Sequence, residues 1–115
     1  MKISLENHFV YIVTNQGKTT IYIGITNNLP QRIIEHYLNR GNPETFAGRY
    51  NCYWLIYYEG YKYINDAIRR ETELKKWSRQ KKNDLIATFN PKWELLNYEL
   101  FDNWPPQNLF HRKDL

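Results

Sequence analysis

The sequence predicts an α+β domain in which secondary-structure elements follow one another in the order β-β-α-β-α, with the last helix dividing in two. Two runs rich in β-branched and aromatic residues, 8–14 and 19–26, flank a turn cluster and predict a β-hairpin. Helical spacing of apolar residues then begins at Leu29, and a third strand-like run follows at 52–59. The length of 115 residues suits one domain with one core.

The segment after the hairpin has the features of a helix start. Asn27 or Asn28 can cap the helix, and Pro30 falls in its first turn, where the missing N–H of proline costs nothing. Its apolar stripe is expected to be Leu29, Ile33, Ile34, Tyr37 and Leu38.

The rest of the chain continues with a loop, a strand and a long helical segment. The polar stretch 39–51 is expected to be a loop. The run 52–59 is continuously apolar, so we expect a strand covered on both faces at the centre of the core. Asn65 is expected to cap a helix that runs to about residue 88 and breaks near Ser78. We place the main domain at 1–93 and treat 94–115 as a C-terminal extension that packs on the domain or serves an interaction.

Composition excludes several classes of protein. The apolar runs are too short to span a bilayer, and the first ten residues lack the features of a secretory signal, so we expect a cytoplasmic protein without membrane contact. Cys52 is the one cysteine, which rules out an internal disulfide. One cysteine and three scattered histidines do not make a Cys/His zinc site, so a bound metal would be held mainly by oxygen.

Positive charge is concentrated in one segment. The net charge is +4, and residues 62–82 hold eight basic and three acidic side chains. Such a stripe suits a polyphosphate partner, although a solvated lysine-rich helix face is an equal alternative. We call the basic stripe the six residues Arg69, Lys75, Lys76, Arg79, Lys81 and Lys82.

A carboxylate falls on the apolar side of the long helix. At about 100° per residue, Glu71 projects between Ile68 and Leu74, and Ala67 lies on the same side. A buried charge is paired with an arginine, protonated or bound to a cation. The residue pattern leaves these readings open.

Five other positions are ordinary when each is taken alone. Arg32 and His36 share one helix face, which favours an exposed polar surface. Gly24 interrupts a strand and indicates a bulge or a close approach. Tyr11 and Tyr22, one from each strand of the hairpin, would usually be core aromatics.

Taken in order, however, these residues resemble the motif of the GIY-YIG nuclease superfamily. Val10-Tyr11 matches the end of the GIY element, Tyr22-Ile23-Gly24 matches YIG, and Arg32, His36, Glu71 and Asn90 follow at the family's spacing. The segments YIGITNNLPQRIIEH and AIRRETELKKWSRQKKNDLI look like the small stand-alone bacterial members. Phe9 stands where the family has the first glycine, which bears on the detailed fit of the first strand.

The resemblance implies the GIY-YIG fold, a small three-stranded antiparallel sheet flanked by helices, and metal-dependent hydrolysis of DNA phosphodiesters, as in repair or recombination. Glu71 would bind one Mg²⁺ or Mn²⁺ ion, and Arg32 would hold the phosphate. Tyr11 would be the general base, helped by a relay through His36, and Tyr22 would bind phosphate or order the water. Gly24 would let the substrate approach, and Asn90 would brace the site.

Two other functions stay open at this stage. A non-catalytic module on the same scaffold would bind DNA or RNA through the basic stripe and exposed aromatic residues. A protein-interaction domain would use the aromatic C-terminal extension. The expected partner is DNA, duplex or branched, and the residues do not distinguish DNA from RNA.

Overall fold

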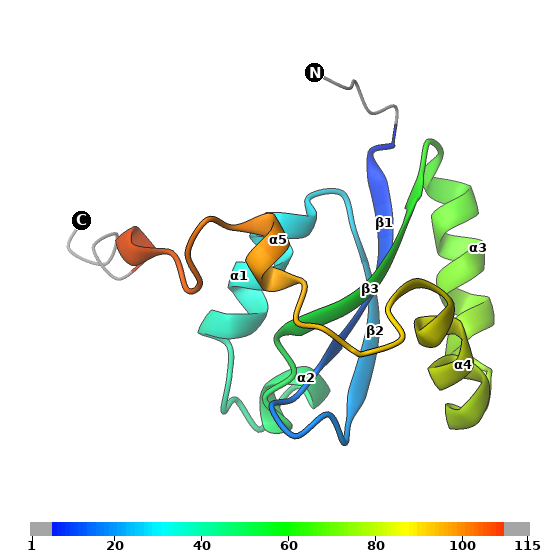
Figure 1. Ribbon diagram of the computed structural model, residues 1–115. Helices are drawn as coiled ribbons and strands as arrows, with labels where there is room; N and C mark the ends of the chain where they lie inside the picture. The colour runs from blue at the N-terminus through cyan, green and yellow to red at the C-terminus, as the bar shows by residue number, and fades with distance from the viewer. Residues whose placement is uncertain (1–5, 110–115) are drawn as a thin grey trace.

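A three-stranded antiparallel sheet forms the middle layer of the molecule in the computed structural model, which describes residues 6–109 (Figure 1). The strand order is β2-β1-β3, with β1 (His8–Thr14) between β2 (Ile21–Thr26) and β3 (Trp54–Tyr61). The α+β architecture and the hairpin predicted from the sequence are confirmed. Residues 1–5 and 110–115 of the predicted domain and extension lie outside the described residues.

Helices cover both faces of this sheet (Figure 1). In chain order the helical elements are α1 (Leu29–Leu38), α2 (Phe46–Arg49), α3 (Ile64–Lys75), α4 (Arg79–Phe89), α5 (Asn97–Leu100) and the 3₁₀ turn η1 (Gln107–Leu109). Helices α3 and α4 lie on one side of the sheet, and α1 and α5 lie on the other. Within residues 6–109, no helix is long and apolar enough to cross a membrane.

The two faces of the sheet have separate hydrophobic cores. Alternate residues of β1 point to opposite faces, so Val10 and Ile12 join the core under α3, while Tyr11 and Val13 join the core under α1. Strand β1 therefore lies at the centre of the core, whereas the third strand was expected there. The reason is pairing: β1 is hydrogen-bonded on both edges, and β3 pairs on one edge only.

Polar caps set the helix boundaries. The Asn28 side chain accepts a hydrogen bond from the Gln31 N–H and caps α1, and Ser78 caps α4 in the same way from Lys81. The predicted cap at Asn65 is wrong, because α3 begins at Ile64 and Asn65 is already the second residue of the helix. The N-cap position belongs to Tyr63, whose backbone is extended and whose side chain makes no capping hydrogen bond.

The predicted loop 39–51 contains a short helix. Thr45 accepts a hydrogen bond from the Gly48 N–H and starts the single turn of α2. Backbone bonds from Gly41 to Gly48 and from Cys52 to Ala47 tie both ends of the segment together. Because its backbone donors and acceptors are used in this way, the segment has a defined shape.

The C-terminal segment runs along the free edge of β3. The Leu96 N–H donates to the Leu55 carbonyl at 2.8 Å. The buried Asn97 side chain accepts from the Leu55 N–H at 2.7 Å and donates to the Tyr53 carbonyl at 3.1 Å. These bonds satisfy edge groups of a strand that would otherwise be left without partners at that edge.

Asn97→Ala tests how much this edge contributes to stability. The variant leaves the Leu55 N–H and the Tyr53 carbonyl without their side-chain partners, so the free energy of unfolding should fall by about 2 to 3 kcal/mol. Urea unfolding followed by circular dichroism measures the change. Asn103→Ala, at an exposed position, is the matched control and should leave the midpoint unchanged. Equal stability of the two variants would contradict an anchoring role.

Candidate active site

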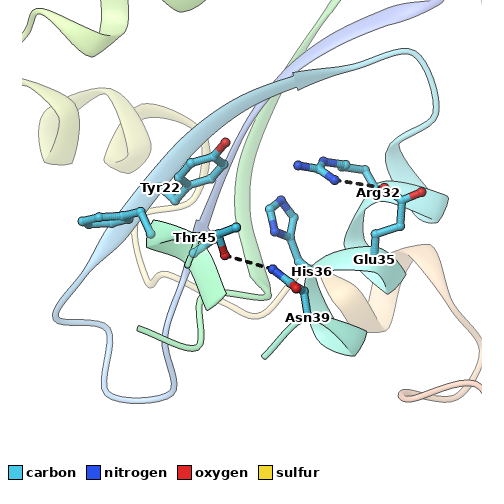
Figure 2. A pocket seen from close by; sticks show the side chains of 8 residues that line it. Tyr22, Arg32, Glu35, His36, Asn39 and Thr45 are labelled. Carbon is cyan, nitrogen blue, oxygen red and sulfur yellow. Dashed lines mark hydrogen bonds and ion pairs between the residues drawn. The ribbon is translucent and has the colours of Figure 1, made fainter. Parts of the chain in front are cut away.

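A cleft of about 430 Å³ opens beside β2, α1 and α2 (Figure 2). Tyr22 comes from β2, Arg32 and His36 come from α1, and Thr45 precedes α2. The cleft is lined by Tyr22, Arg32, Glu35, His36, Asn39, Thr45, Phe46 and Ala47. Three of the residues singled out in the sequence therefore meet at one opening in the surface.

Tyr11 lies directly behind this cleft and is fully buried. It pairs with Gly24 across the β1–β2 ladder. A Cβ atom added at Gly24 would overlap the Tyr11 hydroxyl and ring, so the ring occupies the space that any larger residue would fill. Gly24 is therefore a point of close approach between neighbouring strands, one of the two readings that the sequence left open.

The Tyr11 hydroxyl joins two side chains of α1. It lies 2.7 Å from His36 Nε2 and accepts a hydrogen bond from Arg32 Nε at 3.1 Å. The arginine can only donate, whereas the Tyr11 hydroxyl can either donate to His36 Nε2 or accept from it. The tautomer of a neutral His36 sets the direction: Nε2 accepts when the ring proton is on Nδ1 and donates when it is on Nε2.

The surroundings of His36 favour this neutral form. Burial and the nearby positive charge of Arg32 lower the pKa of His36 to about 4. Burial raises the pKa of Tyr11 to about 12, although the hydrogen bond from Arg32 opposes the shift. At neutral pH the cluster is therefore phenol, imidazole and guanidinium, with one positive charge.

The burial of His36 corrects the prediction for the face of α1. Leu29, Ile33 and His36 form the buried stripe of the helix, while Leu38, expected in that stripe, is exposed. An imidazole tolerates this position because the Tyr11 hydroxyl supplies a hydrogen-bond partner. The sequence alone favoured an exposed surface at Arg32 and His36, and only Arg32 is partly exposed.

Glu71 is on α3, which packs on the opposite face of the sheet. Ala67 and Leu74 point into the core, with Glu71 between them, whereas Ile68 is 46% exposed and was wrongly assigned to the apolar side. The Glu71 side chain is 18% exposed and pairs with Lys75 at 3.3 Å. Its negative charge contributes to the raised pKa of Tyr11, so its field reaches the cluster.

The side chains of residues 6–109 limit the kind of metal ion that the protein could hold. Among residues 6–109 no group of three or more His, Cys, Asp and Glu side chains is positioned to hold a metal. A single carboxylate such as Glu71 suits Mg²⁺ or Mn²⁺, because Mg²⁺ takes few protein ligands and keeps several of its waters. The residues present therefore fit a weakly held, hydrated divalent cation and do not fit a closed zinc site.

Asn90 lies apart from the cleft. Its side chain donates to the Ile56 and Glu94 carbonyls and accepts from the Glu94 N–H, each at 2.9 Å. These bonds tie the end of α4 to β3. The basic stripe is also separate from the cleft lining, because its residues lie on α3, on α4 and, for Lys76, at the end of α3.

Sequence reasoning missed part of the cleft wall. Glu35 forms an ion pair with Arg32 at 3.0 Å, and Asn39 donates to Thr45 at 2.9 Å, as Figure 2 shows. The capping pattern of Thr45 followed by Gly48 was the available signal for α2. Phe46, half exposed on α2, had no signal, because its place depends on how the segment 39–52 folds back.

Comparison with known proteins agrees with this geometry. The model of the GIY-YIG catalytic domain matches residues 7–84. The chain belongs to the GIY-YIG family. The family predicted from the motif is thereby confirmed. Membership of the GIY-YIG family places the protein in a nuclease superfamily, whose substrates are nucleic acids. Asn90 and the C-terminal extension lie beyond the matched residues.

Relatives of this GIY-YIG chain are smaller proteins that match it over nearly their whole length. A UPF0213 protein of Staphylococcus saprophyticus is 32% identical over 83 residues, which cover 72% of this chain and 98% of the relative. A UPF0213 protein of Staphylococcus aureus is 34% identical over 82 residues, covering 71% and 96%. The solution NMR structure of a UPF0213 protein from Bacillus halodurans is 30% identical, covers 76% of this chain and 89% of that one, and has a TM-score of 0.48.

The His36 pKa predicts a pH-dependent stability. Below the ordinary value of 6.5, the unfolded chain binds a proton that the folded protein does not accept until about pH 4. The free energy of unfolding should therefore fall, by on the order of 3 kcal/mol from this group, as the pH decreases between these values. Chemical denaturation at several pH values, compared with His36→Gln, measures it. The variant should lose this component, and parallel curves for the two proteins would contradict the assignment.

Proposed function

We propose that the protein is a metal-dependent endonuclease that hydrolyses DNA phosphodiesters in the cleft beside β2 and α1. The observation that carries the proposal is the Tyr11, Arg32 and His36 cluster, which holds a guanidinium against a cleft in a chain of the GIY-YIG family. A buried tyrosine that is hydrogen-bonded to both a histidine and an arginine does more than fill space. The bond to His36 holds the Tyr11 hydroxyl in place, and that hydroxyl in turn holds the Arg32 guanidinium.

Arg32 is the phosphate ligand in this proposal. The Arg32 side chain is 38% exposed and lines the cleft. Its Nε donates a hydrogen bond to the Tyr11 hydroxyl, and its Nη1 donates one to Glu35. The planar fork of an arginine suits two phosphate oxygens at once. Because the Glu35 pair is largely exposed, an entering phosphate can replace that carboxylate at modest cost.

Glu71 is the proposed metal ligand. Mg²⁺ or Mn²⁺ bound there would neutralise negative charge on the phosphate and on the leaving oxygen. The Glu71 side chain is mostly buried and forms an ion pair with Lys75, whose side chain is about half exposed. An exposed lysine of this kind can swing away when a divalent cation takes its place.

Burial separates the proposed roles of the two tyrosines. Tyr22 lines the cleft, whereas Tyr11 is fully covered and cannot meet a water molecule in this conformation. We therefore assign Tyr22 to the side of the attacking water and Tyr11 to positioning Arg32 and His36. With its ring proton on Nδ1, His36 would accept the Tyr11 proton at Nε2 if that phenol ionised beside a bound cation.

One observation favours a second candidate, a nucleic-acid-binding module without catalysis. The Lys75 ammonium already neutralises Glu71, as it would in a chain that no longer binds metal. The basic stripe and the cleft would then hold nucleic acid without cutting it. Metal-dependent cleavage distinguishes the two candidates.

Glu71→Ala tests the proposed metal site. Wild-type protein should nick supercoiled plasmid in Mg²⁺ or Mn²⁺ and leave it intact in chelator, and Glu71→Ala should lower the rate at least about 100-fold, because the cation loses its carboxylate. Glu73→Ala is the matched control on the same helix, since its carboxylate pairs with Arg70, and it should cut normally. Agarose gel assays give the rates. Full activity of Glu71→Ala would exclude the metal role.

Binding without cleavage by wild-type protein in either metal would support the second candidate. A panel of duplex, single-stranded, branched and RNA substrates then defines which nucleic acid is held or cut. Arg32→Lys adds a check on the phosphate ligand, because it keeps the charge and loses the fork.

The basic stripe gives a separate prediction about affinity. Lys75 and Arg69 are ion-paired within the described residues, whereas Lys76, Lys81 and Lys82 have no ion pair there. Neutralising these last three to glutamine should weaken DNA binding, and the slope of log affinity against log salt should flatten by about 0.9 for each lost phosphate contact. Lys92→Gln, on an exposed residue outside the stripe, is the control. An unchanged slope would show that the stripe is only a solvated surface.

A further inference from the structure

An exposed aromatic pair, one member of which lines the cleft, lies on and just after α2. The Phe46 side chain is 51% exposed and lines the cleft, and Tyr50, also exposed, lies one helical turn later. The ring centroids of Phe46 and Tyr50 are 4.9 Å apart. Phe46 also stacks on Tyr22, with ring planes inclined by 26° and centroids 6.4 Å apart.

The segment that carries this pair is built to hold it at the surface. The Thr45 cap, the bond from Asn39 to Thr45 and the Arg49 bond to the Pro43 carbonyl hold α2 in place. A Cβ at Gly48 would overlap the Thr45 hydroxyl and two backbone carbonyls, so close packing requires glycine there. These bonds hold the exposed Phe46 ring at the lining of the cleft.

We propose that Phe46 and Tyr50 form a stacking platform for an unpaired nucleobase next to the phosphate held by Arg32. The inference rests on the proposed function and adds a substrate class, nucleic acid with an unpaired base at the site of cleavage. Every base has an apolar face that stacks on aromatic rings, largely independently of sequence. A base within a duplex has both faces covered by its neighbours, so the platform selects an unpaired one.

The chemistry of the cleft matches a nucleotide better than an apolar ligand. The guanidinium of Arg32 at one wall attracts a phosphate, and the Phe46 ring at another offers a stacking surface. Tyr22 links Phe46 to the Tyr11, Arg32 and His36 cluster, because its ring contacts both His36 and Phe46. The volume of about 430 Å³ falls in the range of roughly 300 to 1,000 Å³ that is typical of small-molecule sites.

The test measures binding and therefore does not depend on cleavage. Full-length protein in chelator is titrated into a fluorescein-labelled single-stranded 12-mer, and anisotropy gives the affinity. The same oligonucleotide with its four central bases removed retains every phosphate and loses the stacking faces. Wild-type protein should bind the intact oligonucleotide at least about 5-fold more tightly than the abasic one, given the usual strength of base stacking.

Phe46→Ala should abolish that preference while keeping the affinity for the abasic strand. Phe89→Ala is the matched control, because Phe89 is 49% exposed, packs on Tyr57 and Tyr58, and lies on α4 outside the cleft lining. It should retain the preference. Phe46→Trp keeps an aromatic face and should restore the preference, which separates stacking from damage to α2.

Three results would overturn the platform. These are equal affinity of wild-type protein for intact and abasic strands, a preference that survives Phe46→Ala, and tighter binding of a fully paired duplex than of the single strand. A protein that binds with the expected preference and cuts nothing would refute the nuclease proposal and leave the platform standing. Cleavage without the preference would do the reverse.

Discussion

The Tyr11 hydroxyl, held between His36 and Arg32, is the interaction on which the site depends. It joins the central strand to α1 through two hydrogen bonds, and its ring fits only because Gly24 has no side chain. Burial raises the pKa of Tyr11, so the phenol loses its proton less readily, and lowers the pKa of His36, so the imidazole gains one less readily. The cluster therefore remains neutral apart from Arg32, whose single charge faces the cleft. An arginine aimed in this way is prepared for an anion before any anion arrives.

In the proposed mechanism, two layers contribute to the same chemistry from opposite faces of the sheet. Helix α1 supplies the arginine and histidine, while α3 supplies Glu71, a carboxylate close enough to influence the Tyr11 pKa. A thin sheet of three strands makes this possible, because β2 is an edge strand and side chains from both faces can approach it.

The segments outside the motif have distinct tasks. Residues 39–52 place an aromatic surface at the cleft, and the chain after Asn90 protects the free edge of β3 through the Leu96 backbone and the Asn97 amide. Both segments achieve this with hydrogen bonds from side chains to backbone, because neither is long enough to build a core of its own. Asn90 acts with the segment that follows it, since its three hydrogen bonds connect the end of α4 and Glu94 to β3.

The sequence by itself determined the elements that depend on local patterns. The hairpin, the Asn28 and Ser78 caps and the GIY-YIG motif could be predicted because alternation, capping residues and motif spacing are properties of neighbouring residues. Tertiary structure decided the rest: that β1 lies at the centre, that His36 is buried and that Phe46 stands at the cleft. Each of these depends on a partner far away in the chain, such as the Tyr11 hydroxyl that makes a buried imidazole tolerable. No local pattern carries that information, because the hydrogen bond exists only after strand and helix have packed.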